Sequence, residues 1–295
     1  MTVENMPAAE VDIDDPLVRR LLADQHPELG SLALQRLANG WDNVMYRLGD
    51  ELVVRLPRRL AGAVLLDNEQ RWLGELAPRL PIPIPVPLHI GRPAHGFPWS
   101  WSVTRWFDGE VAAIAQIGDP AEQARRLGSF VAALHTAAPA DAPVNPVRGG
   151  PLADRNDVLR QRVGRVGSMI EASAVLSLWE ELVATPLWPG PPVWLHGDLH
   201  TANVLVHEGK IAAIIDFGDI TSGDPATDLA IGWMLFDPPA RSEFRAGCGT
   251  VDDDTWARAR GWAVHLSLAY LANSADNPLM TAIGLRTLTA ALSGP

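Results

Sequence analysis

The spacing of hydrophobic residues changes near residue 107, and it predicts a different kind of structure on each side of that point. In the first part, short apolar segments separated by turn residues are typical of β-strands. A longer segment, 65–76, places positions 65, 69, 72, 73 and 76 on one face, which predicts one main helix. A shorter helix is expected to begin at Pro16, with Asp15 as its N-cap. The predicted strands are 31–38, 44–48, 52–56, 88–90 and 99–106.

The part after residue 107 is expected to be mainly helical. Apolar residues between positions 124 and 134 recur at helical spacing behind the start signal Asp119-Pro120, which predicts a buried helix. The segment Leu80–Leu88 in the first part has proline at every second position, so it should be an extended connector. Further helices are predicted within 152–188, after Asp224-Pro225, and at 254–271 and 277–292.

One hairpin interrupts the helical part. Apolar residues at 204–206 and 211–215 predict two short strands, and Glu208-Gly209 supplies the turn. This hairpin brings Asp198, Asn203 and Asp216 to the same end. Two carboxylates and an amide oxygen can act as hard oxygen ligands for a metal, and a carboxylate can also accept a proton. This set indicates phosphate chemistry with magnesium rather than zinc or thiol chemistry. The alternative is that these residues cap turns, as isolated Asp and Asn residues often do.

The spacing of these residues resembles that of a known enzyme class. Asp198 and Asn203 stand five positions apart and are followed by Asp216-Phe217-Gly218, a pattern similar to the catalytic and metal-binding loops of protein-kinase-like phosphotransferases. His196-Gly197-Asp198, in place of His-Arg-Asp, resembles the aminoglycoside phosphotransferase family of small-molecule antibiotic kinases. The segment Gly40-Trp41-Asp42-Asn43 resembles the macrolide phosphotransferase branch of that family.

The resemblance implies an α+β, bilobal, protein-kinase-like fold. Residues 1–107 would form a nucleotide-binding lobe with a five-stranded antiparallel sheet and one main helix. Residues 108–295 would form a larger, mostly helical lobe that carries the catalytic β-hairpins and binds the acceptor. The hinge is expected at about 104–110, where the nucleotide base would lie against the backbone.

The resemblance also assigns roles at the site. Asp198 would be the catalytic residue that orients the acceptor hydroxyl and takes its proton late. Asn203 and Asp216 would hold Mg²⁺ on the phosphates of ATP or GTP, the co-substrate. The enzyme would transfer the γ-phosphate to a small-molecule alcohol, an antibiotic in the first place, and so give resistance by inactivation.

The expected nucleotide-binding residues are Gly40, Asn43, Arg55, Glu69, Arg105, Trp106 and Phe107. Kinases place a lysine on the third strand, but the one lysine of this chain is Lys210, in the turn of the later hairpin. Arg55 is therefore the candidate to bind phosphate. Glu69 lies on an otherwise apolar helix face and needs a cationic partner, for which Arg55 is the candidate; a surface glutamate at the edge of that face is the alternative.

Three residues are expected to support the loops of the site. His196 would pack beside the Asp-Phe-Gly segment and hydrogen-bond to its backbone. His200 would either touch phosphate or hold its own loop. Asp228 lies in a segment that resembles a family motif whose aspartate braces the catalytic loop through backbone N–H groups. Asp219 and Asp237 could line an anionic pocket for an amine-bearing acceptor, or could simply cap helices.

Composition narrows the class of partner. The 295 residues carry a formal net charge of −11, which argues against nucleic acid and anionic membranes and suits a cationic small molecule. Cys248 is the one cysteine, so no intramolecular disulfide can form, and this fits a reducing cytoplasm. No signal peptide is visible in residues 1–15. Oligomeric state cannot be predicted.

Three alternatives stay open at this stage. The acceptor could be a metabolite alcohol of the sugar, choline or homoserine type. His196, Asp198 and His200 alternate along the chain and superficially resemble the metal cluster of a hydrolase, although Asn203 and Asp216 then have no role. Finally, the missing lysine leaves room for a catalytically inactive, nucleotide-binding relative.

Overall fold

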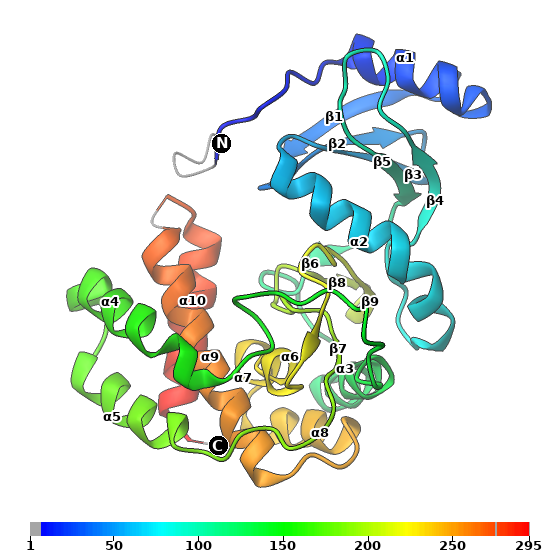
Figure 1. The fold of residues 1–295 in the computed structure, drawn as a ribbon. Helices are drawn as coiled ribbons and strands as arrows, with labels where there is room; N and C mark the ends of the chain where they lie inside the picture. The colour runs from blue at the N-terminus through cyan, green and yellow to red at the C-terminus, as the bar shows by residue number, and fades with distance from the viewer. Residues whose placement is uncertain (1–6, 275, 295) are drawn as a thin grey trace.

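The computed structural model describes residues 7–274 and 276–294. It has two parts, a sheet with its helices and a larger helical part (Figure 1). The sheet is antiparallel, with the strand order β1-β2-β3-β5-β4. Both the five strands and the α+β architecture were predicted, and both are confirmed. The strands are β1 (Leu34–Asn39), β2 (Asn43–Leu48), β3 (Leu52–Pro57), β4 (Pro87–Gly91) and β5 (Trp101–Arg105).

The sheet packs its buried face against α1 (Asp15–Gln25). Leu21 and Leu22 from the helix meet Tyr46, Leu48 and Trp101 from the strands, and each of these side chains is fully buried. The helix begins one residue earlier than predicted, because Asp14 is the N-cap and its carboxylate accepts a hydrogen bond from the Leu17 N–H at 2.8 Å.

The main helix of the first part, α2 (Leu60–Leu76), packs against β3, β4 and β5. Its last turns bury Trp72, Leu73 and Leu76 in the core of the helical part. The proline-rich connector that follows is neither helix nor strand between residues 80 and 86, and its Ile82 and Ile84 are buried in the same core. The connector is therefore part of the packing between the two parts.

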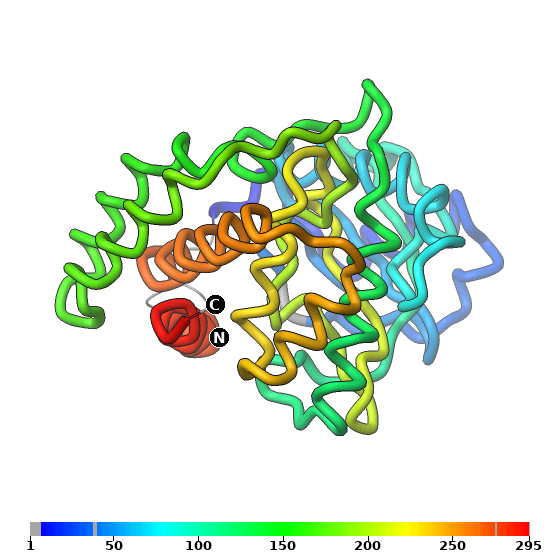
Figure 2. The backbone as a smooth tube through the Cα atoms, turned by 90° about the horizontal axis from the view of Figure 1, so that it is seen from below, coloured from blue at the N-terminus to red at the C-terminus, as the bar shows by residue number. Residues whose placement is uncertain are grey.

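The helical part is arranged around α9 (Asp253–Asn273), which lies between α10 on one side and α4 and α5 on the other (Figure 2). No helix within the described ranges has both the length and the apolar character that membrane crossing requires. The other helices are α3 (Pro120–Leu134), α4 (Asn156–Val166), α5 (Ala172–Val183), α6 (Ala226–Leu229), α7 (Ile231–Leu235), α8 (Pro238–Gly247) and α10 (Pro278–Leu292), and the short 3₁₀ turns are η1 (Pro27–Leu29), η2 (Ala77–Arg79), η3 (Leu152–Arg155) and η4 (Gly167–Met169).

The predicted hairpin is present as β8 (Val204–His207) and β9 (Lys210–Ile214). Its turn places both Glu208 and Gly209 in the left-handed region, with φ of 50° and 75°, as two-residue hairpins require. The sequence pattern missed three short strands: β6 (Glu110–Val111), which pairs with β8, and β7 (Val193–Leu195) and β10 (Thr221–Gly223), which pair with each other. The structure also contains α8, which was not predicted.

Close contact between α3 and α8 leads to a stability prediction. A Cβ atom at Gly128 of α3 would lie 2.4 Å from the carbonyl oxygen of Phe244 on α8. Gly128→Ala would force the helices apart, and we expect it to lower the free energy of unfolding by about 1–3 kcal/mol. Chemical denaturation measures the change.

Gly74→Ala is the matched control. Gly74 also lies inside a helix, α2, but nothing lies within 4 Å of a Cβ added there. This change should raise the free energy of unfolding by roughly 0.5–1 kcal/mol, because alanine favours a helix over glycine. Equal effects at the two glycines would contradict the close packing of α3 on α8.

Candidate active site

The predicted catalytic and metal-binding residues meet at one end of the β8–β9 hairpin. The Ile215 N–H donates to the Asn203 carbonyl oxygen at 2.9 Å, which extends the strand pairing by one step and sets Asp216 beside Asn203. The Asn203 Nδ2 group donates to the Asp198 carbonyl oxygen at 2.9 Å. The backbone of Asp216 turns sharply there, with φ of 63°, and its side chain lines the adjacent cleft. The structure thus brings all three residues together.

Asp228 joins this loop to the hydrophobic core. It lies on α6 with no exposed surface, and its carboxylate accepts hydrogen bonds from the backbone N–H groups of His196 at 2.7 Å and Gly197 at 3.0 Å. The His135 Nε2 group lies 3.2 Å from the same carboxylate. Charge-assisted bonds of this kind offset the cost of burying the charge. These are the contacts of a residue that braces the loop.

His196 uses both of its ring nitrogens within the loop. Its Nε2 group lies 3.0 Å from the carbonyl oxygen of Ile215, which can only accept, so Nε2 carries the proton. Nδ1 then accepts from the backbone N–H of Asp198 at 3.3 Å. The ring packs on Phe217, with 4.3 Å between centroids. His196 therefore packs on the Asp-Phe-Gly segment as expected, but its hydrogen bond goes to the carbonyl of Ile215, the residue directly before that segment.

His200 holds the carboxylate of Asp198. Its Nδ1 atom accepts from the Ala202 N–H at 3.1 Å, so Nε2 carries the proton and lies 3.3 Å from Asp198 Oδ2. Of the two roles considered for His200, these contacts are those of a residue that holds the loop. Because both histidines spend their ring nitrogens on protein groups, neither offers a lone pair to a metal, and the hydrolase alternative loses its support.

Arg148 is a site residue that the sequence analysis missed. Its Nη2 group donates to Asp198 Oδ1 at 3.1 Å from the loop after α3. Burial would raise the pKa of the Asp198 carboxyl, but His200 and then Arg148 hold it below its ordinary range, so Asp198 is ionised at neutral pH. The one available signal was indirect: a partly buried aspartate is stabilised by cationic partners, which need not be close to it in the sequence.

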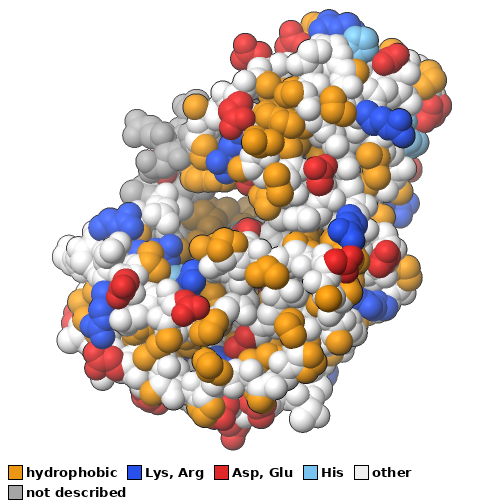
Figure 3. All heavy atoms as spheres, in the orientation of Figure 1, with side chains coloured by type: hydrophobic (Ala, Val, Ile, Leu, Met, Phe, Trp, Pro, Cys, Tyr) orange, Lys and Arg blue, Asp and Glu red, His pale blue; other side chains and the backbone are white. Residues whose placement is uncertain are grey.

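A cleft of about 440 Å³ lies between the sheet and the hairpin. Figure 3 shows the molecule hollowed between its two parts. Glu69 is the one predicted nucleotide residue that does not line the cleft, since it lies behind Arg55. The predicted nucleotide residues that do line it are Gly40, Asn43, Arg55, Arg105, Trp106 and Phe107, and Asp216 lines it as well.

Arg55 and Glu69 form a buried, two-pronged ion pair. Arg55 Nη2 lies 3.1 Å from Glu69 Oε1, and Nη1 bonds to Oε2. Although burial alone would lower the pKa of Arg55, the charges of Glu69 and Asp216 raise it. Glu69 thus has the cationic partner that its position on α2 required. Lys210 lies exposed at the start of β9, away from this pair.

The two acidic residues suggested for the acceptor lie in different surroundings. Asp219 is close enough to Asp198 and Arg148 for their charges to affect its pKa, and its carboxylate accepts from Asn145 Nδ2 at 2.7 Å. Asp237 instead is the N-cap of α8, where it accepts from the Ala240 N–H at 3.1 Å. The carboxylate of Asp237 is therefore engaged as a helix cap, which was the alternative given for it, and the structure gives no support to an acceptor role. The helix that it caps was not predicted.

Asn203 and Asp216 fit a magnesium ion. Because Asn203 Nδ2 donates to the Asp198 carbonyl, its Oδ1 atom points the other way, and Asp216 adds a carboxylate at the cleft. Oxygen donors of this kind suit Mg²⁺, which keeps several waters and needs few protein ligands. Within the described ranges, one cluster of three histidine or acidic side chains could hold a metal ion, and it lies elsewhere, at His26, Glu28 and His89.

The fold and the site together define a bilobal, protein-kinase-like phosphotransferase. Residues 33–262 match the model of the phosphotransferase enzyme family, and the chain belongs to that family. This match confirms the resemblance seen in the catalytic hairpin. An aminoglycoside 3′-phosphotransferase from Escherichia coli is 36% identical over 81 residues, which span 26% of this chain and 30% of the length of that curated relative.

Two solved structures share the fold. The GDP complex of wild-type aminoglycoside 2′-phosphotransferase-IIIa superposes with a TM-score of 0.69 and 19% identity, over 95% of this chain and 99% of that one. The apoenzyme of a macrolide 2′-phosphotransferase from Brachybacterium faecium has a TM-score of 0.62 and 24% identity, over 95% and 98% of the two chains. At these identities the comparison establishes the fold alone.

The bracing bonds of Asp228 can be tested by Asp228→Asn. An amide has one accepting oxygen, and its NH₂ group would face a backbone N–H, so a buried donor loses its partner. We expect the free energy of unfolding to fall by about 1–3 kcal/mol and the turnover rate to fall with it, because the loop that carries Asp198 is no longer fixed. Thermal unfolding and a phosphate-transfer assay measure the two effects.

Asp237→Ala is the control for that variant. Loss of the α8 N-cap should cost about 1 kcal/mol of stability and leave the transfer rate unchanged. A loss of activity at Asp237 would instead restore its suggested acceptor role.

The Arg55–Glu69 pair gives a second test. Arg55→Met leaves Glu69 buried without a partner, and we expect a loss of roughly 3–5 kcal/mol of stability. The double variant Arg55→Met with Glu69→Leu removes both charges and should recover most of that stability. If Arg55 also binds phosphate, the double variant will be stable and still bind nucleotide poorly by calorimetry. Normal nucleotide affinity in the double variant would limit Arg55 to a structural role.

Proposed function

We propose that this protein transfers the γ-phosphate of ATP or GTP to a hydroxyl group of a small molecule. The observation that carries the proposal is the convergence of Asp198, Asn203 and Asp216 at one end of the hairpin, beside a cleft that Asp216 and Arg55 both line. Phosphoryl transfer needs little covalent help from the protein. It needs alignment of the two reactants and neutralisation of charge, and these residues offer both.

Asp198 is the proposed base. Its carboxylate would accept a hydrogen bond from the acceptor hydroxyl and aim that oxygen at the γ-phosphorus. The new O–P bond forms as the bond to the β-phosphate oxygen breaks, and the hydroxyl proton passes to Asp198. The low pKa of Asp198, caused by His200 and Arg148, suits a proton that is transferred late. Asn203 and Asp216 would hold Mg²⁺, which neutralises phosphate charge when bound.

The cleft is the proposed nucleotide site, with residues 104–110 as the hinge between the two lobes. The Trp106 indole is fixed at this edge, since its Nε1 group donates to Asp108 Oδ1 at 2.7 Å and the Arg47 guanidinium lies 3.9 Å from the centre of its ring. The apolar residues Val53 and Leu205 line the same cleft and offer walls for a flat base. The GDP complex of the aminoglycoside 2′-phosphotransferase supports a purine nucleotide here.

An antibiotic acceptor is supported by the names of the relatives, which are aminoglycoside and macrolide phosphotransferases. Inactivation of such a compound would give resistance. A metabolite alcohol of the sugar, choline or homoserine type would use the same base and the same metal ligands. The reaction type therefore depends on the hairpin, and the acceptor depends on residues outside it.

Asp198→Asn tests the proposed base. We expect nucleotide and Mg²⁺ to bind with unchanged affinity in calorimetry, while transfer of labelled γ-phosphate falls by about 10²–10⁴-fold. Asp216→Asn should differ, because it removes a metal ligand and should weaken binding of the magnesium–nucleotide complex itself. Retained transfer in Asp198→Asn, or no binding of triphosphate to the unchanged protein, would overturn the proposal.

A further inference from the structure

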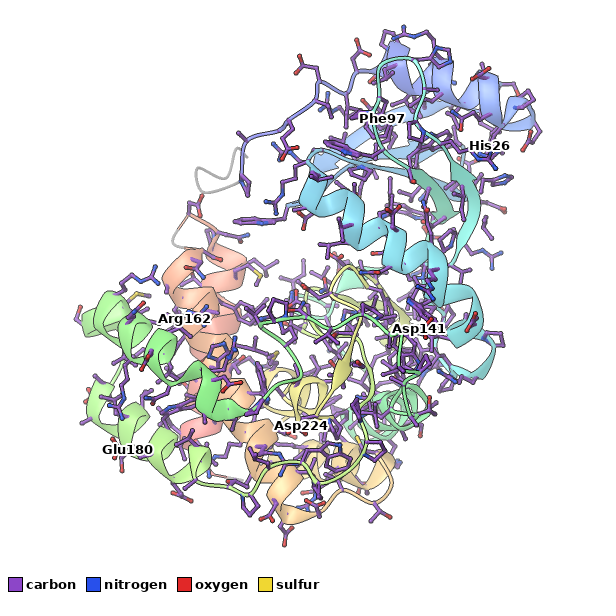
Figure 4. All side chains as sticks on the ribbon, viewed as in Figure 1. His26, Phe97, Asp141, Arg162, Glu180 and Asp224 are labelled. Atoms are coloured by element: carbon purple, nitrogen blue, oxygen red, sulfur yellow. The ribbon has the colours of Figure 1, made fainter. Side chains whose placement is uncertain are left out.

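Arg148 contacts Asp198, and two further arginines lie near Arg148, outside the cleft assigned to the nucleotide. Arg148 comes from the loop after α3, Arg155 from η3 and Arg162 from α4. Figure 4 shows Arg162 on α4 facing α9. In Figure 3, lysine and arginine side chains gather beside the hollow, over α4. None of the three arginines lines the nucleotide cleft.

These arginines lie close enough to act on one another. Burial lowers the pKa of Arg162, and the charges of Arg148, Arg165 and Arg155 lower it further. Burial also lowers the pKa of His265 on α9, to about 2, and the charges of Arg162, Arg148 and Arg155 contribute. Like charges gathered in this way are unfavourable unless something negative balances them.

Few acidic side chains among the described residues form ion pairs with these arginines. Arg148 pairs with Asp198, but neither Arg155 nor Arg162 has an ion pair within 4.0 Å in residues 7–274 and 276–294. By contrast Arg160, two residues before Arg162 on α4, pairs with Glu180 at 3.0 Å on the exposed face. The side of α4 that faces α9 is thus left with positive charge.

Unpaired hydrogen-bond donors accompany this charge. The Nε groups of Arg148, Arg155 and Arg162 are buried without a partner, as are the His265 Nδ1 atom and the Tyr270 hydroxyl. Arg162 Nη1 lies 3.2 Å from His265 Nε2, and a guanidinium can only donate, so Nε2 accepts and Nδ1 carries the proton. Burial raises the pKa of Tyr270 well above 10, so its hydroxyl also keeps its proton.

Buried donors are rarely left unpaired, because each costs about 1–3 kcal/mol. Five such donors around Arg148, the partner of the proposed base, indicate a ligand that brings acceptor oxygens with it. Planar guanidinium groups match carboxylate and phosphate oxygens, which also supply the missing negative charge. A polycationic compound would instead meet charges of its own sign.

We infer that the acceptor alcohol carries an oxyanion, a carboxylate or a phosphate, which Arg148, Arg155 and Arg162 bind next to Asp198. This inference rests on the proposed phosphate transfer and names the class of its acceptor. It reverses the expectation, drawn from Asp219, Asp237 and the overall negative charge, that the acceptor is an amine-bearing compound. The arginines would fix the anionic end of the acceptor and leave its hydroxyl to Asp198.

The test compares acceptors that differ in charge. The full chain with Mg²⁺ and saturating ATP or GTP is assayed for transfer of labelled γ-phosphate to gluconate, glucose 6-phosphate, glucose and kanamycin. We expect at least one of the two anions to exceed glucose in kcat/KM by about tenfold or more, and kanamycin to stay below glucose. The carboxylate and phosphate arms distinguish the two kinds of oxyanion.

Arg162→Gln removes one charge and keeps a hydrogen-bond donor. It should raise the KM for the preferred anion by about tenfold, with little change in kcat or in the KM for the nucleotide. Arg160→Gln, on the same helix but on its exposed face, is the matched control and should change none of these values. An unchanged KM in Arg162→Gln overturns the assignment of this residue.

The outcomes separate this inference from the proposed function. Transfer to kanamycin or glucose in preference to both anions overturns the oxyanion acceptor and leaves phosphate transfer standing. Transfer to none of the four, while magnesium–nucleotide still binds and is slowly hydrolysed, also counts against the oxyanion acceptor. Failure to bind or hydrolyse nucleotide at all overturns the proposed function.

Discussion

Asp228 accepts hydrogen bonds from two successive backbone N–H groups, those of His196 and Gly197, and the position of Asp198 depends on this contact. The carboxylate lies on α6 within the hydrophobic core, so its hydrogen bonds fix the loop, which has no regular secondary structure, to that core. Gly197 is required for the same geometry. Its φ is 84°, and a Cβ atom there would lie 2.1 Å from the carbonyl oxygen of Asp219. This close approach explains why a glycine stands where the kinase motif has arginine.

Sequence reasoning succeeded where the cause of the structure is local. The turn at Glu208-Gly209, the cap at Asp119 and the apolar face of α2 each depend on residues within one or two turns of chain, and each is present in the structure. Glu69 could be assigned a cationic partner because a charge on an apolar face has few alternatives. The arrangement at the end of the hairpin followed in the same way, since strand pairing places residues 203 and 216 side by side.

The features that were missed depend on contacts far apart in the sequence. Arg148 reaches Asp198 across 50 residues from a loop rich in proline and glycine, and no spacing rule connects the two. The helix α8 begins with Pro238-Pro239 and buries few residues, and most of its stability comes from packing against α3. Because α8 was not expected, nothing in the sequence favoured the capping role of Asp237 over an acceptor role. Burial and partner, rather than residue type, decide what such a side chain does.

The distribution of positive charge follows from the chemistry that the hairpin indicates. The chain has net charge −11 and a single lysine, yet Arg55 lines the cleft beside Asp216 and Arg148 contacts Asp198. A nucleoside triphosphate would bring several negative charges to this cleft, where Glu69 holds the guanidinium of Arg55 in place. Around Arg148, which pairs with Asp198, the half-buried Arg155 and Arg162 have no carboxylate partner among the described residues. Gathering like charges in this way costs free energy, and the inferred anionic group of the acceptor would offset that cost.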